Sequence, residues 1–593
     1  MTYPTKWNLA RYFYTGLDDQ KLAADIANIL PTTEKFSKQY EHTFHTFTTP
    51  EQILRFYSDY TAMSHDMATP SYYLFYRSSL DTQDLAVTKR MGEVDYIYTE
   101  ASNQMLWVAQ GWKTIGYDRI IAWAHDPIMA RYKNDLLSTA DSIRYILGAA
   151  EEKVLNLKSR PLSLANSLHD ELTGSYEYTM TIDGEERKLT EEEVRSYRQH
   201  TDRNIRRESY ASLRRVYNSK QAQISLGNIY TSIVKDWSSE ITMRGYPDSV
   251  MAQRNISEEM DDVVVDMLLS EVEKAYPLYQ RFLRAKAGML TLDSDFSVYD
   301  IGAPLGTVDK NFTFDEAYDL HLSVMKDFDS EFYDYSVRMI EEERIDALPG
   351  AGKRGGAYAS YRKGEESFVL LNFTGKLRDV STISHELGHA IHGHLSQWQE
   401  APVYDSALSM AETASIFSEM LLGEKVKSLV TAEEYKEYLN ERLGDIFATI
   451  FRQVQYVAFE REVHTQIHSG EELSYKDLNI LWRQHQDSLY GGVVAYDIDA
   501  ENESGWSMIP HIYHTPFYCY AYAFGNLLTF ALYNKVQDWS LSKEDYKDIL
   551  RSGGSERPRD ILARYGIDIA SPEFYRAGLR EVEKMVEEFE RMV

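Results

Sequence analysis

The segment from His385 to His389, HELGH, contains residue types that could hold a metal ion and hydrolyse an amide bond. On an α-helix, positions i and i+4 lie one turn apart on the same face, so both imidazoles can bind one ion. The carboxylate of Glu386 lies beside the first ligand and can take a proton from a water whose pKa zinc lowers toward about 7. The pattern therefore predicts a zinc hydrolase with His385 and His389 as ligands and Glu386 as general base.

The helix that must carry this motif is visible in the flanking sequence. Apolar residues recur at helical spacing, at Val380, Ile383, Leu387 and Ile391. This pattern buries one face of the helix, while the histidine pair lies on a different face. Two further histidines, His392 and His394, follow the motif, and we interpret them as core or supporting residues rather than ligands.

A catalytic zinc site usually has three protein ligands and one open position, so a third ligand is needed. The metzincin pattern fails, because it requires Gly and His where this chain has His392 and Leu395. The remaining choice is a carboxylate from a second helix, and the small, apolar segment ALSMAETASIFSEMLLGEKV contains Glu412. Glu419 lies two turns further along the same face, where it can orient a ligating imidazole, and it is the next candidate for the third ligand.

A second cluster, near the C-terminal end, combines two histidines with three tyrosines. Its members are His511, His514, Tyr518, Tyr520 and Tyr522. An aromatic stripe on a helix is usually core, but Tyr or His donors aimed at a developing oxyanion are what metal-assisted amide hydrolysis needs besides the metal. The segment alone leaves core packing and catalysis equally open.

Most of the remaining sequence predicts long amphipathic helices, as in residues 261–290, where apolar residues lie three and four apart. β signals appear at residues 174–189 and 367–373. The second lies between a glycine-rich stretch, residues 348–356, and the motif helix, where an exposed strand edge could pair with an extended peptide. We expect a mostly helical N-terminal domain over residues 1–195 and a catalytic domain over residues 196–593.

Composition restricts the possible partners. The net charge is −29, with 63 Lys and Arg against 92 Asp and Glu, which disfavours nucleic acid and anionic membranes. The single cysteine, Cys519, excludes an intramolecular disulfide and a zinc site built from several thiolates. No secretory signal and no membrane-spanning run of apolar residues is visible in the sequence. These features predict a cytoplasmic protein.

Four segments together resemble the oligoendopeptidase F branch of the thimet oligopeptidase family of gluzincin peptidases. They are DVSTISHELGHAIHGHLS, ETASIFSE, HIYHTPFYCYAYAFG and GGSERPRDILARYGIDIASPEFYRAGL, in the family's order and approximate spacing. The resemblance extends over most of the chain, and the N-terminal region matches less plainly.

The resemblance implies a mostly helical, two-lobed shell around a deep channel that admits unstructured oligopeptides and excludes folded proteins. It implies one zinc ion per chain, with Glu412 as the third ligand. It also implies that His511 and Tyr520 contact the substrate or the transition state, with Tyr518 and Tyr522 as rivals that could bind the substrate.

The glycine-rich stretch resembles the family's loop that lines the substrate channel. The residues of this loop that we predict to contact the substrate are Gly355, Gly356 and Ala357. Glycine at these positions could also serve only to form a turn.

The sequence therefore predicts a zinc-dependent endopeptidase that cuts internal bonds of short, unstructured peptides. One alternative is a related zinc carboxypeptidase or dipeptidyl carboxypeptidase, which would add a cationic site for the substrate's C-terminus. Another is an inactive peptide-binding scaffold, against which the joint retention of both histidines, Glu386 and Glu412 argues. The sequence leaves the oligomeric state open.

Overall fold

The computed structural model of the 593-residue chain describes residues 2–247, 249–306 and 310–593. The described residues form mostly helices, with a few short strands in two small sheets, which confirms the predicted fold class. The chain divides into two compact units, each built from three separate segments. Unit 1 comprises residues 1–146, 310–428 and 539–565, and unit 2 comprises residues 147–309, 429–538 and 566–593.

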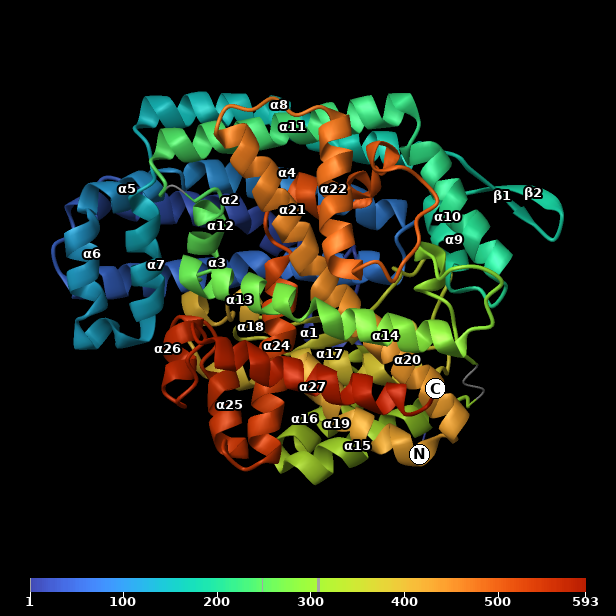
Figure 1. The fold of residues 1–593 in the computed structure, drawn as a ribbon. Coiled ribbons are helices and arrows are strands. Elements are labelled where there is room, and N and C mark those ends of the chain that lie inside the picture. The colour runs from blue at the N-terminus through green and yellow to red at the C-terminus, as the bar shows by residue number, and fades with distance from the viewer. Residues whose placement is uncertain (1, 248, 307–309) are drawn as a thin grey trace. The chain divides into compact units, whose positions relative to one another are not determined.

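Unit 1 contains the helix of the histidine motif. Its helices are α1 (Leu9–Tyr12), α2 (Gln20–Tyr40), α3 (Pro50–Leu80), α4 (Leu85–Gln104), α5 (Trp107–Ile115), α6 (Tyr117–Ala124), α7 (Lys133–Ile143), α15 (Phe314–Phe328), α16 (Ser330–Glu341), α17 (Leu377–Leu395), α18 (Leu408–Ala411), α19 (Thr413–Leu429), α25 (Lys543–Arg551) and α26 (Pro558–Ala563). The motif helix is α17, which packs against α15, α16 and α25 (Figure 1).

A three-stranded sheet lies against the motif helix in unit 1. Its strands are β3 (Ile345–Asp346), β4 (Tyr358–Ser360) and β5 (Phe368–Leu370), in the order β3-β5-β4. The central strand, β5, is fully buried, as expected of a strand with neighbours on both sides. It confirms the β signal at residues 367–373. Strand β4 pairs antiparallel with β5 and forms an edge of the sheet.

Unit 2 contains the second candidate cluster. Its helices are α8 (Ala149–Gly174), α9 (Glu191–Ser196), α10 (Arg203–Tyr217), α11 (Lys220–Arg244), α12 (Ala252–Ser257), α13 (Asp262–Lys274), α14 (Tyr276–Met289), α20 (Ala432–Thr449), α21 (Phe451–His468), α22 (Tyr475–Tyr490), α23 (His511–His514), α24 (Tyr520–Gln537) and α27 (Pro572–Glu590). Helices α8 and α11 lie side by side, as Figure 1 shows.

Local sequence explains where several of these elements begin and end. The hairpin β1 (Tyr178–Ile182) and β2 (Glu185–Leu189) turns at Gly184, which has a φ of 83°. Thr190 then caps α9 through a capping box with Glu193. The single helix expected over residues 261–290 is divided into α13 and α14, because Pro277 has no N–H to continue the first helix.

The predicted domain boundary can be compared with the two units. The units separate after residues 146, 309, 428, 538 and 565, and none of these positions lies near residue 195. Segments from three distant parts of the sequence form each core, which a division at one position cannot describe. A functional boundary at residue 195 stays a prediction.

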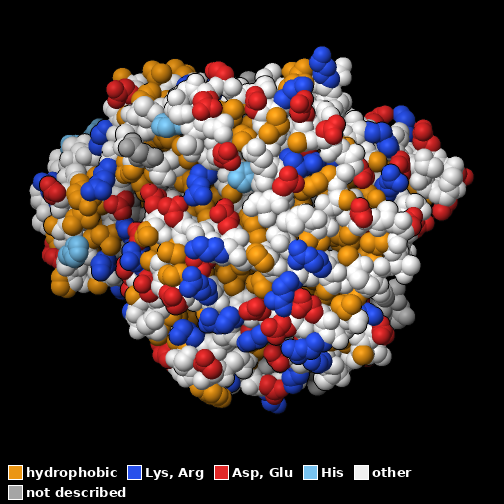
Figure 2. All heavy atoms as spheres, viewed as in Figure 1, with side chains coloured by type: hydrophobic (Ala, Val, Ile, Leu, Met, Phe, Trp, Pro, Cys, Tyr) orange, Lys and Arg blue, Asp and Glu red, His pale blue; other side chains and the backbone are white. Residues whose placement is uncertain are grey.

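Charged side chains of both signs occupy the surface. On the face shown in Figure 2, Asp and Glu side chains lie among Lys and Arg side chains. The acidic excess of the chain therefore does not form one continuous negative field on this face. None of the helices that the structure describes combines the length and apolar character needed to span a lipid bilayer.

Candidate active site

The histidine motif lies on the middle turns of α17. The apolar side chains of this helix face the core, while His385 and His389 are partly exposed on another side. Their ring centroids are 4.9 Å apart, with an interplanar angle of 82°. The two imidazoles therefore share one face of the helix, at the spacing that the i and i+4 positions require.

Gly388 allows a second helix to approach this face. A Cβ atom added at Gly388 would lie 2.6 Å from both the carbonyl oxygen of Ala414 and the Cα of Ser415. Any larger residue would force the first turn of α19 away from α17. The contact places Glu412, at the junction of α18 and α19, beside the two histidines.

The spacing of the three side chains suits metal ligands better than hydrogen bonds. Oε2 of Glu412 lies 3.5 Å from Nε2 of His385 and 3.4 Å from Nε2 of His389. Two donor atoms that each lie about 2.0–2.1 Å from a tetrahedral zinc are about 3.4 Å apart. Hydrogen bonds between such groups would be about 2.7–2.9 Å long. His385, His389 and Glu412 thus form a group that could hold a metal ion.

Glu419 fixes the orientation of the first histidine. Nδ1 of His385 donates a hydrogen bond of 2.6 Å to Oε1 of Glu419. Burial alone would lower the pKa of His385, but this bond and the nearby carboxylates raise it to about 9. This raised pKa favours protonation of both ring nitrogens. A metal ion that binds Nε2 would displace the proton there, while Glu419 keeps the proton on Nδ1 and holds the ring in the orientation that a ligand requires.

Opposing effects act on the pKa of each of the two site carboxylates. Burial raises the pKa of Glu386, which is 7% exposed, against the attraction of His385 and His389. Burial would also raise the pKa of Glu412, but the neighbouring His389 and His385 and a hydrogen bond from the hydroxyl of Ser415 lower it to about 2. Glu386 is thus suited to accept a proton, and Glu412 stays ionised to bind a cation.

Strand β4 packs against α17 next to Glu386, the candidate general base. The backbone of Ala359 donates a hydrogen bond to Glu386. Ala359 is the middle residue of the edge strand and pairs with Val369 of β5. The edge of the sheet and the candidate general base are therefore direct neighbours within unit 1.

The glycine-rich stretch before β4 forms an exposed turn. Gly352 and Gly356 have φ angles of 77° and 76°, which favour glycine over residues with a side chain. Nδ2 of Asn372 donates hydrogen bonds to the carbonyls of Arg354 and Gly356, at 2.9 and 2.7 Å. Gly355 and Gly356 are exposed and Ala357 is half-buried. This arrangement leads the chain into the edge strand.

The two histidines after the motif, His392 and His394, are not part of the group formed by His385, His389 and Glu412. His392 is buried, and burial lowers its pKa to about 4. The ring of His394 stacks on Tyr335, with centroids 4.1 Å apart. Both therefore have packing roles, in agreement with the interpretation from the sequence.

In unit 2, the aromatic segment is not one helix. It consists of the short α23, a turn, and α24, which starts at Tyr520. The hydroxyl of Tyr522 lies 3.4 Å from Nε2 of His511, and the rings of Tyr518 and Tyr522 are 5.2 Å apart. Tyr520 is fully buried, and its hydroxyl has no hydrogen-bond partner among the described residues. The structure brings His511 together with Tyr518 and Tyr522, and separates Tyr520 from them.

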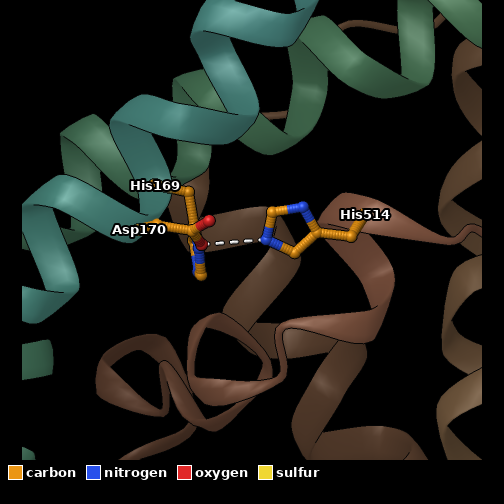
Figure 3. A group of neighbouring side chains, drawn as sticks. All are labelled: His169, Asp170 and His514. Atoms are coloured by element: carbon orange, nitrogen blue, oxygen red, sulfur yellow. Dashed lines mark hydrogen bonds and ion pairs between the residues drawn. The ribbon is translucent and has the colours of Figure 1, made fainter. Parts of the chain in front are cut away.

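His514 belongs to a second group of histidines and a carboxylate. Nε2 of His514 donates a hydrogen bond of 2.8 Å to Oδ1 of Asp170 on α8, as Figure 3 shows. Nδ1 of His169 donates to the same oxygen at 3.0 Å. Residue types alone would also permit a metal ion here, but both distances are those of hydrogen bonds.

Comparison with known proteins identifies the family. Residues 196–581 match peptidase family M3. The chain belongs to this family. It is therefore an oligopeptidase, and the peptidases of this family are metal-dependent. The match begins where the predicted catalytic domain begins, although the compact units divide elsewhere.

The similar M3 proteins include several oligoendopeptidases. Oligoendopeptidase F from Lactococcus lactis subsp. cremoris is 30% identical over 413 residues, which cover 69% of this chain and 67% of the relative. An oligoendopeptidase F homolog from Borreliella burgdorferi is 25% identical over 595 residues, 98% of both chains. These matches confirm the resemblance that the motifs indicate.

Solved structures show the same fold. A putative peptidase from Chlamydophila abortus has a TM-score of 0.88 at 24% identity, and covers 100% of this chain and 99% of that chain. Oligoendopeptidase-F from Enterococcus faecium has a TM-score of 0.70 at 19% identity, with 97% and 99% covered. At these identities the similarity establishes the M3 fold alone.

Some residues that support this M3 peptidase site gave no signal in the sequence. Ser384 of α17 is hydrogen-bonded, at 3.0 Å, to Nδ1 of the buried His321 on α15, which connects the motif helix to its neighbour. The contact between Ala359 and Glu386 depends on how strand β4 packs against α17, so the sequence alone could not predict it.

Proposed function

We propose that this M3 peptidase is a zinc-dependent endopeptidase that hydrolyses internal bonds of short, unstructured oligopeptides. The observation that carries the proposal is the spacing of 3.4–3.5 Å between Oε2 of Glu412 and the two imidazole nitrogens. Two neutral imidazoles and one carboxylate are a donor set that zinc commonly takes in hydrolases. His385, His389 and Glu412 would bind one zinc ion per chain.

When bound, zinc would polarise the attacking water and the carbonyl of the scissile bond. Glu386 would take a proton from that water and pass it to the leaving amine. Its raised pKa supports this role, because a general base works best when its pKa approaches the working pH. Glu419 would keep the proton of His385 on Nδ1, so that Nε2 stays available as a ligand.

His511 and a neighbouring tyrosine would donate hydrogen bonds to the carbonyl oxygen as it becomes an oxyanion. The sequence favoured Tyr520 as this tyrosine, with Tyr518 and Tyr522 as rivals. The full burial of Tyr520 and the distance of 3.4 Å between Tyr522 and His511 support Tyr522 instead. Burial lowers the pKa of His511, with a further contribution from His514, which favours its neutral form.

The substrate would bind as an extended strand at the free edge of β4. Backbone pairing at a sheet edge recognises any extended peptide and excludes segments that are already folded. Residues Gly355, Gly356 and Ala357 lead into this strand and would contact the peptide, as Tyr518 and Tyr522 would elsewhere. The hydrogen bond from Ala359 to Glu386 supports a peptide position beside the general base.

The proposed location of the protein and the alternative to its function rest on the sequence. The single cysteine fits a reducing compartment, and we propose a cytoplasmic location. A related zinc carboxypeptidase or dipeptidyl carboxypeptidase is the alternative function, because the same metal chemistry would serve either.

One experiment tests activity, metal dependence and cleavage mode together. The purified protein is incubated with a mixture of unstructured peptides, half of them blocked at both ends, with and without a chelator. We expect internal cleavage of blocked peptides, loss of activity with the chelator, and no cleavage of a stably folded protein. Cleavage only of peptides with a free C-terminus, seen by mass spectrometry, would instead support the carboxypeptidase alternative.

A further inference from the structure

The turn between α23 and α24 has an unusual backbone conformation. Phe517 has a φ of 63°, in the left-handed region that a bulky residue rarely adopts. This turn reverses the chain between His511 on α23 and Tyr522 on α24. The hydrogen bond of 3.4 Å between these two side chains therefore depends on a conformation that the local sequence disfavours, so surrounding residues must maintain it.

Glu460 of α21 holds the turn from the core. The backbone N–H of Phe517 donates a hydrogen bond of 3.0 Å to Oε1 of Glu460. Arg254 of α12 adds a second bond, from Nε to the carbonyl of Pro516 at 3.0 Å. Glu460 is only 1% exposed, and its Oε2 has no hydrogen-bond partner among the described residues. Burial of a carboxyl group that is not fully hydrogen-bonded costs free energy. The hydrogen bond from the backbone N–H of Phe517 explains why a carboxyl group is present here.

Asp170 of α8 holds α23, which lies before this turn in the sequence. Its Oδ1 accepts the hydrogen bonds from His514 and His169 described above, at 2.8 and 3.0 Å (Figure 3). The ring of His169 also packs on Tyr513, with centroids 4.0 Å apart. These contacts fix the last two residues of α23, Tyr513 and His514, to the long helix α8.

The distances in this group argue against a metal ion. Nδ1 of His169 and Nε2 of His514 lie 3.0 and 2.8 Å from Oδ1 of Asp170, whereas two ligand atoms of one tetrahedral zinc are about 3.4 Å apart. The group is therefore a hydrogen-bonded clamp.

We propose that Asp170 and Glu460 are positioning residues that together hold His511 and Tyr522 in the orientation required for transition-state stabilisation. Asp170 fixes α23, which carries His511, and Glu460 fixes the turn that leads to α24 and Tyr522. Neither carboxylate needs to touch the substrate. The inference rests on the proposed donor role of His511 and Tyr522.

The test compares matched pairs of variants at each carboxylate. Asp170→Asn and Glu460→Gln keep an oxygen that accepts the hydrogen bonds, whereas Asp170→Ala and Glu460→Leu remove it. We expect kcat to fall about 10-fold in Asp170→Ala and Glu460→Leu, toward the ~10²-fold that a misplacement of 1 Å can cause. KM and bound zinc should stay unchanged, and the two conservative variants should keep most of the wild-type kcat.

A double-mutant cycle separates positioning from a general loss of structure. In a background that lacks both donors, His511→Ala with Tyr522→Phe, Asp170→Ala and Glu460→Leu should cause little further loss of kcat, because the donors that they position are already absent. Losses that multiply fully with that of the His511→Ala and Tyr522→Phe background would overturn the inference. Wild-type kcat in Asp170→Ala and Glu460→Leu, alongside a large loss in Tyr522→Phe, would overturn it and leave the proposed function intact.

The proposed donor role of His511 and Tyr522 can be tested separately from the positioning role of the carboxylates. If Tyr522→Phe and His511→Ala both keep the wild-type kcat, the donor role is wrong, and the inference fails with it. If Glu460→Leu does not fold, the Asp170 pair decides the outcome, because the Asp170 side chain is 59% exposed and can be replaced without opening the core.

Discussion

The residues that the structure describes include two groups of two histidines and one carboxylate, and the geometries of these groups differ. In unit 1, Oε2 of Glu412 lies 3.4–3.5 Å from the imidazole nitrogens of His385 and His389. In unit 2, Oδ1 of Asp170 lies 2.8 and 3.0 Å from those of His514 and His169. The first spacing leaves room for an ion between the groups, and the second is filled by the protons of hydrogen bonds.

The hydrogen bonds made by Nδ1 of His385 and of His169 explain why the two groups differ in spacing. Glu419 accepts the Nδ1 proton of His385, which frees Nε2 to bind a metal. At His169, the proton on Nδ1 is directed at Asp170 itself, and the buried Nε2 finds no described partner. The comparison shows that residue types identify a possible metal site, while the position of each proton decides whether metal or hydrogen bonds fill it.

The largest effect should come from the residue that gives the first group its chemistry. Glu386→Gln should keep bound zinc and lower kcat by ~10²–10⁴, the range typical of a lost general base. Asp170→Asn is the matched control, since it makes the same chemical change in the second group and should keep most of the activity. A Glu386→Gln variant with the wild-type kcat on peptides would remove Glu386 from the mechanism.

The tyrosines beside the second group provide the next test. Tyr522→Phe removes one hydroxyl and should lower kcat by ~10²-fold with little change in KM, as for loss of an oxyanion donor. Tyr520→Phe should cause the smaller loss, because Tyr520 is fully buried. Steady-state kinetics on one blocked peptide measures both. A larger loss in Tyr520→Phe would restore the choice made from the sequence.

The outer carboxylate of the first group should have a moderate effect. Glu419→Gln keeps an acceptor for Nδ1 of His385 but removes the negative charge, and zinc affinity should fall by ~10–100-fold. Competition with a fluorescent chelator measures this affinity. Excess zinc should restore kcat, which distinguishes weaker binding from a misfolded site. Unchanged zinc affinity would show that Glu419 does not tune the ligand.

The smallest effect concerns stability and contrasts Glu412 with Glu460. Histidines lower the pKa of Glu412 to about 2, whereas burial raises that of Glu460 to about 8, against its bond from Phe517 and the charge of Arg254. Tyr230 of α11 and Cys519 also face Glu460 electrostatically. Between pH 4.5 and 8, the folded protein keeps a proton on Glu460 that the unfolded chain releases, so stability falls as pH rises.

Glu460→Gln cannot titrate and should remove this contribution. Its unfolding temperature relative to that of the wild type should therefore rise between pH 5 and pH 8.5, as measured by circular dichroism. Other titrating groups affect both proteins equally and cancel in the difference. A constant difference across this range would mean that the pKa of Glu460 is not raised in the folded protein.

The sequence was sufficient for the first group because its chemistry is local. His385 and His389 lie four residues apart on one helix, and helix geometry alone brings them together. Glu412 was found by its position in an apolar segment, and Gly388 shows why that segment can approach. The mostly helical class also followed from periodicity. The contact between Glu386 and β4 could not be predicted from the sequence, because it is a tertiary contact between a helix and a strand.

The second group could not be predicted, since α8 and α23 are far apart in sequence. The family resemblance implied Tyr520 as the tyrosine that acts with His511, and left Tyr518 and Tyr522 as rivals. The left-handed turn at Phe517 changes which side chains meet, and nothing in the local sequence indicates it. Glu460 and Arg254, from α21 and α12, maintain the turn through contacts that only the fold provides.

Zinc stoichiometry tests the central claim most directly. The wild type, Glu412→Ala and His514→Ala are dialysed against metal-free buffer containing a low, fixed concentration of zinc, and bound zinc per chain is measured by atomic emission. We expect one zinc per chain in the wild type and in His514→Ala, and less than one tenth of that in Glu412→Ala. Two zinc ions in the wild type, a loss of zinc in His514→Ala, or stoichiometric zinc in Glu412→Ala would contradict it.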